Sequence, residues 1–147
     1  MTVSPAEVTV SQAEDTMTVA RWIGSLEAGW RARDAEAIAA LFTDDAAYHQ
    51  GPYGAPHTGR AAVAGHWRGT LSRQKDAKMW FGEPLVSGRR AAVEWWCVLY
   101  DPATGAPRNA AGCLALRFAP DGRCESLHEY WHGAPDQALE PAEGWLR

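Results

Sequence analysis

Hydrophobic side chains recur at steps of three and four residues from Thr16 onward, which is the spacing of one face of an α-helix. Residues 1–15 show no such period and include Pro5, so they are predicted to form a flexible N-terminal tail. A long amphipathic helix is therefore the first expected element. Its apolar face consists of Val19, Trp22, Ile23, Leu26 and Trp30.

Two shorter helices are expected next. Residues 34–42 gather apolar side chains on one side, and Asp34 supplies an N-cap. Residues 43–45 are expected to end this helix, and residues 46–50 to form a brief strand. The Gly- and Pro-rich stretch 51–59 is predicted to be a loop. A third helix over residues 60–74 places Val63, Trp67 and Leu71 on one face.

The rest of the chain favours strands. Runs rich in β-branched, aromatic and alternating apolar residues are separated by turn sequences. Helices followed by meandering strands predict an α+β fold, with helices packed on one face of an antiparallel sheet. The expected domain spans residues 16–133, followed by an acidic C-terminal tail at 134–147. The predicted strands cover residues 78–86, 91–100, 109–118 and 123–132.

Composition narrows the class of protein. The chain has 147 residues, enough for one domain with its own core. The net charge is −4 and most of the excess acid lies near the two ends, so the body is close to neutral and binding to nucleic acid is not expected. No long apolar run or leader-like segment is present, so we expect no membrane span and a cytoplasmic location.

Two further features of the composition are interpreted as structural and not as functional. The three cysteines are unpaired in sequence and have no zinc-site spacing, so they are interpreted as buried or idle thiols. Basic residues between 60 and 90, Arg73 among them, are interpreted as a solvated face. No cofactor motif is present, and no cofactor or metal is expected.

The segment HEYWH at 128–132 matches the zinc-protease pattern H-E-x-x-H. That pattern binds metal only on a helix, where the two histidines lie one turn apart. Here the segment follows a Pro-Asp-Gly turn and is aromatic-rich, which predicts a strand. Along a strand His128 and His132 would be about 13 Å apart, so a metal site is not expected.

Period-two alternation predicts which side chains of the last strand face inward. Leu127, Glu129 and Trp131 form the more apolar face and are assigned to the interior. A carboxylate among apolar groups has a raised pKa, which suits a general acid or base near neutral pH. Two alternatives stay open, a Glu129 bonded structurally at a pocket wall and a solvated strand residue.

The order of these motifs resembles the nuclear transport factor 2-like superfamily, and within it the SnoaL-like branch. The likeness covers about residues 16–133. It implies a conical barrel, a curved sheet wrapped around three N-terminal helices, with a deep apolar pocket and a homodimer formed through the outer sheet face. It is carried by the segments RDAEAIAALFTDDAAYH, GPYGAPHTGRAAVAGHW, VEWW and LRFAPDGRCESLHEYWH.

The resemblance also assigns roles to single residues. The catalytic base of ketosteroid isomerases falls on Gln50, whose amide takes no proton at neutral pH. Limonene epoxide hydrolases place water-holding groups where this chain has Tyr48 and Gln50, and an acid/base carboxylate where it has Glu129. Their charged Arg and Asp fall on Trp95 and Cys97, so that mechanism is not fully carried over.

Aromatic residues are the candidates for binding a ligand. Eight tryptophans are many for so short a chain, and they suggest a lined cavity as well as a core. His66 on the third helix is either a structural histidine or a pocket acid/base, and Tyr53 lies in a loop expected over the pocket mouth. The candidate ligand-binding residues are Trp22, Trp30, Tyr53, His66, Trp67, Trp95, Cys97 and Trp131.

The leading hypothesis is a small protein that binds an apolar small molecule and acts as a cofactor-free isomerase, cyclase or hydrolase. Glu129 is expected to transfer the proton, and Tyr48 and Gln50 to orient substrate or water. The alternative is a ligand-binding or dimeric interaction module without catalysis.

Overall fold

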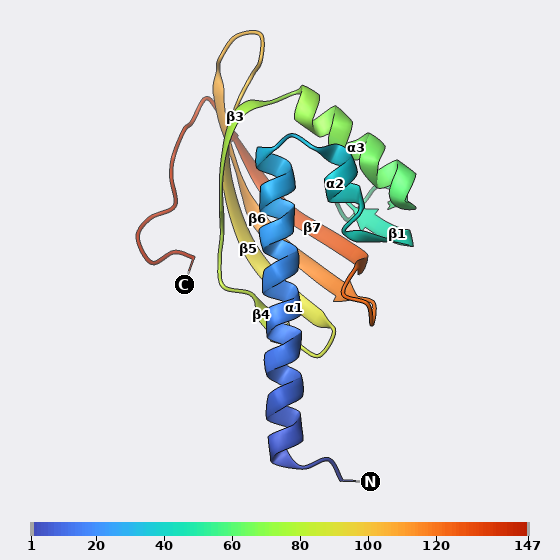
Figure 1. Cartoon of the computed structure of the whole chain (residues 1–147). Coiled ribbons are helices and arrows are strands. Elements are labelled where there is room, and N and C mark those ends of the chain that lie inside the picture. The colour runs from blue at the N-terminus through green and yellow to red at the C-terminus, as the bar shows by residue number, and fades with distance from the viewer. Residues whose placement is uncertain (1, 147) are drawn as a thin grey trace.

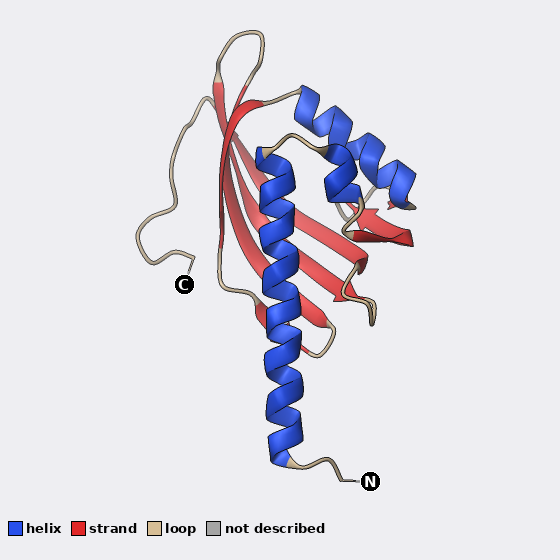
Figure 2. Cartoon of the chain, in the orientation of Figure 1, coloured by secondary structure: helices blue, strands red, loops and turns tan. Residues whose placement is uncertain are grey.

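The computed structural model describes residues 2–146, without the side chains of residues 7–10. Within this part the chain forms three helices and seven strands, and the helices are grouped on one side of the strands (Figures 1 and 2). In chain order the elements are α1 (Pro5–Arg31), α2 (Ala35–Ala39), β1 (Phe42–His49), β2 (His57–Thr58), α3 (Arg60–Ser72), β3 (Lys75–Phe81), β4 (Leu85–Ser87), β5 (Arg90–Tyr100), β6 (Pro107–Phe118) and β7 (Cys124–Pro135).

The strands form one mixed, mostly antiparallel sheet, as predicted. Its order is β2-β1-β7-β6-β5-β3, and β4 is paired with the N-terminal end of β5. The β1–β7 pair is parallel, and the other pairs are antiparallel. The sheet curves, and α1 runs along its concave face beside α2 and α3 (Figure 1). This is the cone-shaped α+β fold that the sequence predicted.

The core lies between α1 and the sheet. Trp22 packs edge-on against Phe42 and Phe118, with ring centroids 5.6 Å apart in both pairs. Its indole N–H donates to the Leu41 carbonyl at 2.8 Å. Burial of such aromatic surface is the main stabilising contribution to the fold. Within residues 2–146, no helix is long and apolar enough to cross a membrane.

The first helix is longer than its apolar pattern. It begins at Pro5, so residues 5–15, assigned to a tail by the sequence, are helical. Proline is favoured in the first helical turn because its missing N–H would have no partner there. This part of the helix projects beyond most of the sheet and needs no apolar stripe (Figure 1). Gln12 still ties it to β4, donating to the Val86 carbonyl at 3.0 Å.

The second helix is shorter than predicted. Asp34 caps it as expected, accepting the Ala37 N–H at 3.0 Å, but the helix ends at Ala39. Residues 43–45 do not form its terminator, since they belong to β1, which begins at Phe42. The prediction therefore assigned the apolar residues 41 and 42 to the end of the helix, although residue 42 begins a strand. A short apolar run has no period long enough to separate the two.

Among the later strands, one predicted strand is in fact two. Residues 78–86 divide into β3 and β4, with the irregular residues 82–84 between them. The other expected strands are present and longer than predicted. In particular, residues 128–132 lie in β7, so HEYWH is a strand as its flanking sequence indicated.

Gly112 marks a close approach of β6 and β7. A Cβ at this position would lie 2.0 Å from the Tyr130 carbonyl oxygen and 2.8 Å from the Trp131 Cα. Only glycine allows the backbones of β6 and β7 to approach this closely. Gly112 therefore fixes how β7 lies against β6, and with it the strand that carries Glu129.

The C-terminal segment is attached to the outer sheet face. Leu139 donates its N–H to Asn109 Oδ1 at 2.7 Å, and its carbonyl accepts from Asn109 Nδ2 at 2.8 Å and from Trp96 Nε1 at 2.7 Å. The Trp145 ring lies edge-on against Trp96 at 6.2 Å. The segment expected to be a peripheral acidic tail thus packs on β5 and β6.

Candidate functional site

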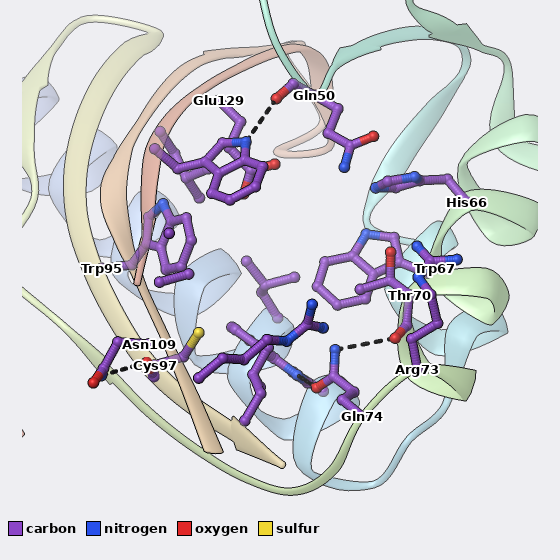
Figure 3. Close-up of a pocket in the computed structure, with 18 of the residues that line it drawn as sticks. Gln50, His66, Trp67, Thr70, Arg73, Gln74, Trp95, Cys97, Asn109 and Glu129 are labelled. Atoms are coloured by element: carbon purple, nitrogen blue, oxygen red, sulfur yellow. Dashed lines mark hydrogen bonds between the residues drawn. The ribbon is translucent and has the colours of Figure 1, made fainter. Parts of the chain in front are cut away.

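A cavity of about 420 Å³ lies between α1, α3 and the concave side of the sheet. Its volume falls within the range of small-molecule sites. In Figure 3 the labelled side chains surround an open centre, with Glu129 and Gln50 on one side and Gln74 on the opposite side. Elements distant in sequence contribute, namely α1, α3, β5, β6 and β7.

Strand alternation places the expected side chains of β7 in this cavity. Leu127, Glu129 and Trp131 all line it, whereas Tyr130 is exposed on the outer face. His128 also faces outward, where its ring stacks on His49 at 4.3 Å. The inward assignment made from sequence thus matches the geometry.

Glu129 is a carboxylate placed in a largely apolar part of the wall. Leu114, its partner across the β6–β7 ladder, and Leu127 on its own strand both line the cavity. Burial raises the Glu129 pKa from 4.5 to about 7. Among the described residues no donor forms a hydrogen bond with its carboxylate. A buried carboxylate without a partner exchanges a proton readily near neutral pH.

Tyr48 and Gln50 lie on the same wall. Tyr48 is 3% exposed, and its pKa is raised well above its usual value by burial first and by the Glu129 charge second. The phenol therefore stays a hydrogen-bond donor. Gln50 lines the cavity, and its backbone carbonyl oxygen accepts the Trp131 indole N–H at 3.2 Å. Trp131 is 47% exposed, so this contact lies at the rim.

Three buried tryptophans form much of the wall. Trp30 packs edge-on against Trp67 at 5.7 Å and donates to Gln74 Oε1 at 2.8 Å. The indole N–H groups of Trp67 and Trp95 are buried and have no hydrogen-bond partner among the described residues. Trp67 lies close enough to Tyr48 to lower the pKa of the Tyr48 hydroxyl, but the Trp67 indole N–H does not meet the geometry of a hydrogen bond. Unpaired buried donors are costly, so these two are available to a polar atom of a ligand.

Two predicted ligand-binding residues lie elsewhere. Trp22 is part of the core below the cavity and does not line it. Its helical face points to the sheet, but α1 reaches the cavity only with Leu26 and Trp30. Tyr53 is fully exposed in its loop and is not on the wall either. Sequence periodicity gives the buried face of a helix but not which part of that face meets a void.

His66 lies on the cavity wall, and its partner was not expected. His57, in the stretch 51–59 predicted to be a loop, lies in β2, where its ring stacks on His66 at 4.4 Å. Tyr48 contacts the His66 ring at 4.9 Å. Burial, then the neighbouring charges of His57 and Arg73, lower the His66 pKa to about 4. His66 is thus a neutral imidazole at pH 7 that donates or accepts one hydrogen bond.

Cys97 lines the cavity between β3 and β6. Burial raises its pKa to about 12, so the thiol remains protonated and is not an activated nucleophile. The Arg108 charge lowers this pKa and the Glu129 charge raises it. Cys97 is therefore within electrostatic reach of both charged groups.

Several polar residues of the wall were not singled out from sequence. Arg73 was assigned to a solvated face, yet it follows His66 and Thr70 at the spacing of one helical stripe. Arg108 precedes the strand predicted from 109, although it has the parity of Leu114. The polar wall residues absent from the prediction are Thr70, Arg73, Gln74, Arg108 and Asn109.

Comparisons with known proteins agree with this architecture. The family model of the SnoaL-like domain matches residues 8–127, ending two positions before Glu129. A search of curated proteins gives no match.

Two solved structures share the fold. The epoxide hydrolase/cyclase-like enzyme SalBIII, described in pyran ring formation in the polyether salinomycin, superposes with a TM-score of 0.70 at 15% identity, over 84% of this chain and 96% of that chain. The second structure is a hypothetical protein with a ketosteroid isomerase-like fold from Catenulispora acidiphila DSM 44928, in complex with trimethylamine. It superposes with a TM-score of 0.67 at 19% identity, over 74% of this chain and 83% of that chain. At these identities the likeness concerns the fold.

Proposed function

The chain belongs to the SnoaL-like domain family, and from that premise we propose that it is a cofactor-independent enzyme that binds a largely apolar small molecule and moves a proton with Glu129. The reaction class is isomerisation, cyclisation or hydrolysis. The ligand lies in the cavity, with its apolar body against Trp30, Trp67 and Trp95.

The observation that carries this proposal is the state of Glu129. The carboxyl has a pKa of about 7, lies in the cavity and forms no hydrogen bond within the described residues. A structural carboxylate would be held by donors and would have an ordinary or lowered pKa. Near neutral pH Glu129 takes a proton from a substrate C–H or O–H, or from water. It then returns that proton to the developing oxygen or carbon.

Tyr48 and Gln50 are assigned to orientation. The Tyr48 hydroxyl keeps its proton, so it donates to a substrate oxygen or holds a water. The Gln50 amide offers a donor and an acceptor at the rim, where its backbone is fixed by Trp131. The comparison with SalBIII supports trying epoxides and ring-forming substrates first.

The test has two steps. Tryptophan fluorescence and melting temperature are measured against apolar epoxides, steroids and polyketide-like aromatics, and each binder is then assayed for turnover. The Glu129→Gln variant should bind with nearly unchanged affinity, while kcat falls about a hundredfold or more. Glu94→Gln, an exposed carboxylate outside the cavity, is the matched control and should keep full activity.

Retained turnover in Glu129→Gln would rule out its catalytic role. The second candidate, a ligand-binding module without catalysis, is favoured by one observation. Among the described residues of the wall, Glu129 is the only carboxylate, so no second carboxylate accompanies it to form an acid/base pair. A pure binder gives saturable binding and no turnover in either form.

A further inference from the structure

The charged groups of the cavity are unevenly distributed. Of the described wall residues that carry a charge at pH 7, two are arginines, Arg73 and Arg108, and one is Glu129. His66 is neutral at that pH because its pKa is about 4. With Glu129 half-ionised near pH 7, positive charge exceeds negative charge in the site.

Neither arginine has an internal partner. Every ion pair formed among the described residues involves other cations, namely Arg31, Arg60, Arg68 and Arg123. The guanidinium groups of Arg73 and Arg108 also donate no hydrogen bond within residues 2–146, unlike that of Arg33, which is bonded to two carbonyls. Their donors are free for a group that enters the cavity.

The two arginines come from separate elements, and both line the cavity from exposed positions at its rim. Arg73 follows the last turn of α3, and Arg108 lies near the start of β6. Both residues are exposed, whereas Tyr48, Trp95 and Leu127 on the inner wall are buried. The Arg73 charge acts on His66 and the Arg108 charge acts on Cys97, which lines the same cavity. Both cations therefore face the space that a ligand would fill.

The rim cations lie away from the proposed proton-transfer group. Leu114 pairs with Glu129 across the ladder, and Arg108 precedes Leu114 by six residues on β6. Their backbone positions are about 20 Å apart along the strand direction. Figure 3 shows Arg73 and Glu129 on opposite sides of the cavity. An anion at the arginines would thus avoid repulsion by an ionised Glu129.

From these observations we propose that the ligand is an apolar carboxylic acid, whose carboxylate is bound by Arg73 and Arg108 at the rim while its apolar body lies in the cavity. The guanidinium fork matches the two oxygens of a carboxylate, and such charge-assisted hydrogen bonds are the strong ones. The inference rests on the proposed function, since it names the ligand class of the same cavity.

The test compares an acid with its neutral isostere. Binding of 1-naphthaleneacetic acid and of 1-naphthaleneacetamide is measured by titration calorimetry at pH 8. Wild-type protein should bind the acid about tenfold or more tightly than the amide. The double variant Arg73→Gln/Arg108→Gln should lose this preference and keep the amide affinity. Arg117→Gln is the matched control, an exposed arginine of β6 outside the cavity.

Three results overturn the proposal. They are equal affinity for acid and amide, an acid preference that survives in the double variant, and no binding by any acid of a panel of aromatic and aliphatic acids. In a fourth outcome, the protein prefers 1-naphthyl phosphate to 1-naphthol but shows no preference for an acid over its amide. This outcome would also overturn the proposal, because the bound anion would be a phosphate and not a carboxylate. Failure of the Glu129→Gln turnover test leaves these binding ratios unaffected, so the two proposals fail separately.

Discussion

At the scale of single residues, Glu129 is a group whose proposed function opposes stability. Its folded pKa of about 7 lies above the ordinary 4.5, so the native state binds its proton more tightly than the unfolded chain. The stability associated with that proton is present below pH 4.5. It is lost as the pH rises towards 7. Above pH 7 the native protein holds an ionised carboxylate in a poorly solvated place.

Replacing Glu129 by Gln should therefore stabilise the protein at alkaline pH. The pKa difference corresponds to about 3 kcal/mol in the free energy of unfolding, and this gain should appear at pH 8 and vanish near pH 4.5. Urea unfolding of both proteins at the two pH values measures it. A loss of about 1–3 kcal/mol at pH 8 would instead indicate a structural carboxylate whose hydrogen bond had been broken.

The pKa of His66 is shifted in the opposite direction to that of Glu129, since burial here favours the loss of a proton. Its pKa is lowered from 6.5 to about 4, so its contribution to stability is present above pH 6.5 and is lost as the pH falls towards 4. Part of this shift comes from the charge of His57, stacked 4.4 Å away. His57→Asn should raise the His66 pKa, as followed by NMR titration of the imidazole Cε1–H. His132→Asn, on the outer face of β7, should leave it unchanged, and an unchanged value in both variants would contradict the stacked pair.

At the scale of elements, the close approach of β7 to β6 depends on one position of β6. The Tyr130 carbonyl oxygen lies 2.0 Å from the place that a Cβ of residue 112 would take. Backbone atoms cannot rotate away, as a flexible side chain would. The close approach is thus a property of the β6–β7 pair that carries both Leu114 and Glu129.

Gly112→Ala should lower the free energy of unfolding by about 2–3 kcal/mol and weaken ligand binding, since it moves β7. Gly65→Ala is the control. The nearest atom to a Cβ there is the end of the Arg68 side chain at 4.0 Å, so alanine should stabilise α3 by about 0.5–1 kcal/mol. Thermal unfolding of the two variants should therefore shift in opposite directions. A tolerated Gly112→Ala would show that the strands can part without cost.

Sequence predicted those elements in which local pattern and tertiary burial agree. The α3 face of Val63, Trp67 and Leu71 and the parity of β7 are of this kind, and both were predicted correctly. The first turns of α1 were missed because their sequence shows no apolar period, and the described side chains at positions 5, 6 and 11–14 are exposed. The start of β1 was missed because Phe42 is buried in a strand directly after a helix. Neither signal is periodic.

The site was predictable only along single elements. Glu129 follows from alternation on one strand, whereas the presence of both Arg73 and Arg108 on the cavity wall depends on how α3 packs over the sheet. The prediction that Trp22 binds the ligand was wrong for the same reason, because the position of a residue along α1 relative to the cavity is a tertiary property. Local pattern tells which side a residue faces, and packing decides what it faces.

At the scale of the whole molecule, the outer sheet face is divided in two. The C-terminal segment covers the β5–β6 side through Leu139, Asn109 and Trp96. Val98 beneath it is 1% exposed although it points outward. The β7–β1 side remains uncovered, with Tyr130 53% exposed beside the His49–His128 stack. Any contact through the outer face must use this uncovered side.

We propose that the chain is a homodimer whose contact is centred on Tyr130. A glutamate placed there would bring two like charges together across a two-fold axis and should convert the dimer to a monomer. Light scattering coupled to size exclusion measures the mass of wild type and of Tyr130→Glu. Tyr53→Glu, at a fully exposed tyrosine in a loop away from the sheet face, should leave the dimer intact. A monomeric wild type, or a Tyr130→Glu variant that stays dimeric, contradicts this assignment, because a large exposed aromatic at a dimer centre cannot accept a charge without loss of affinity.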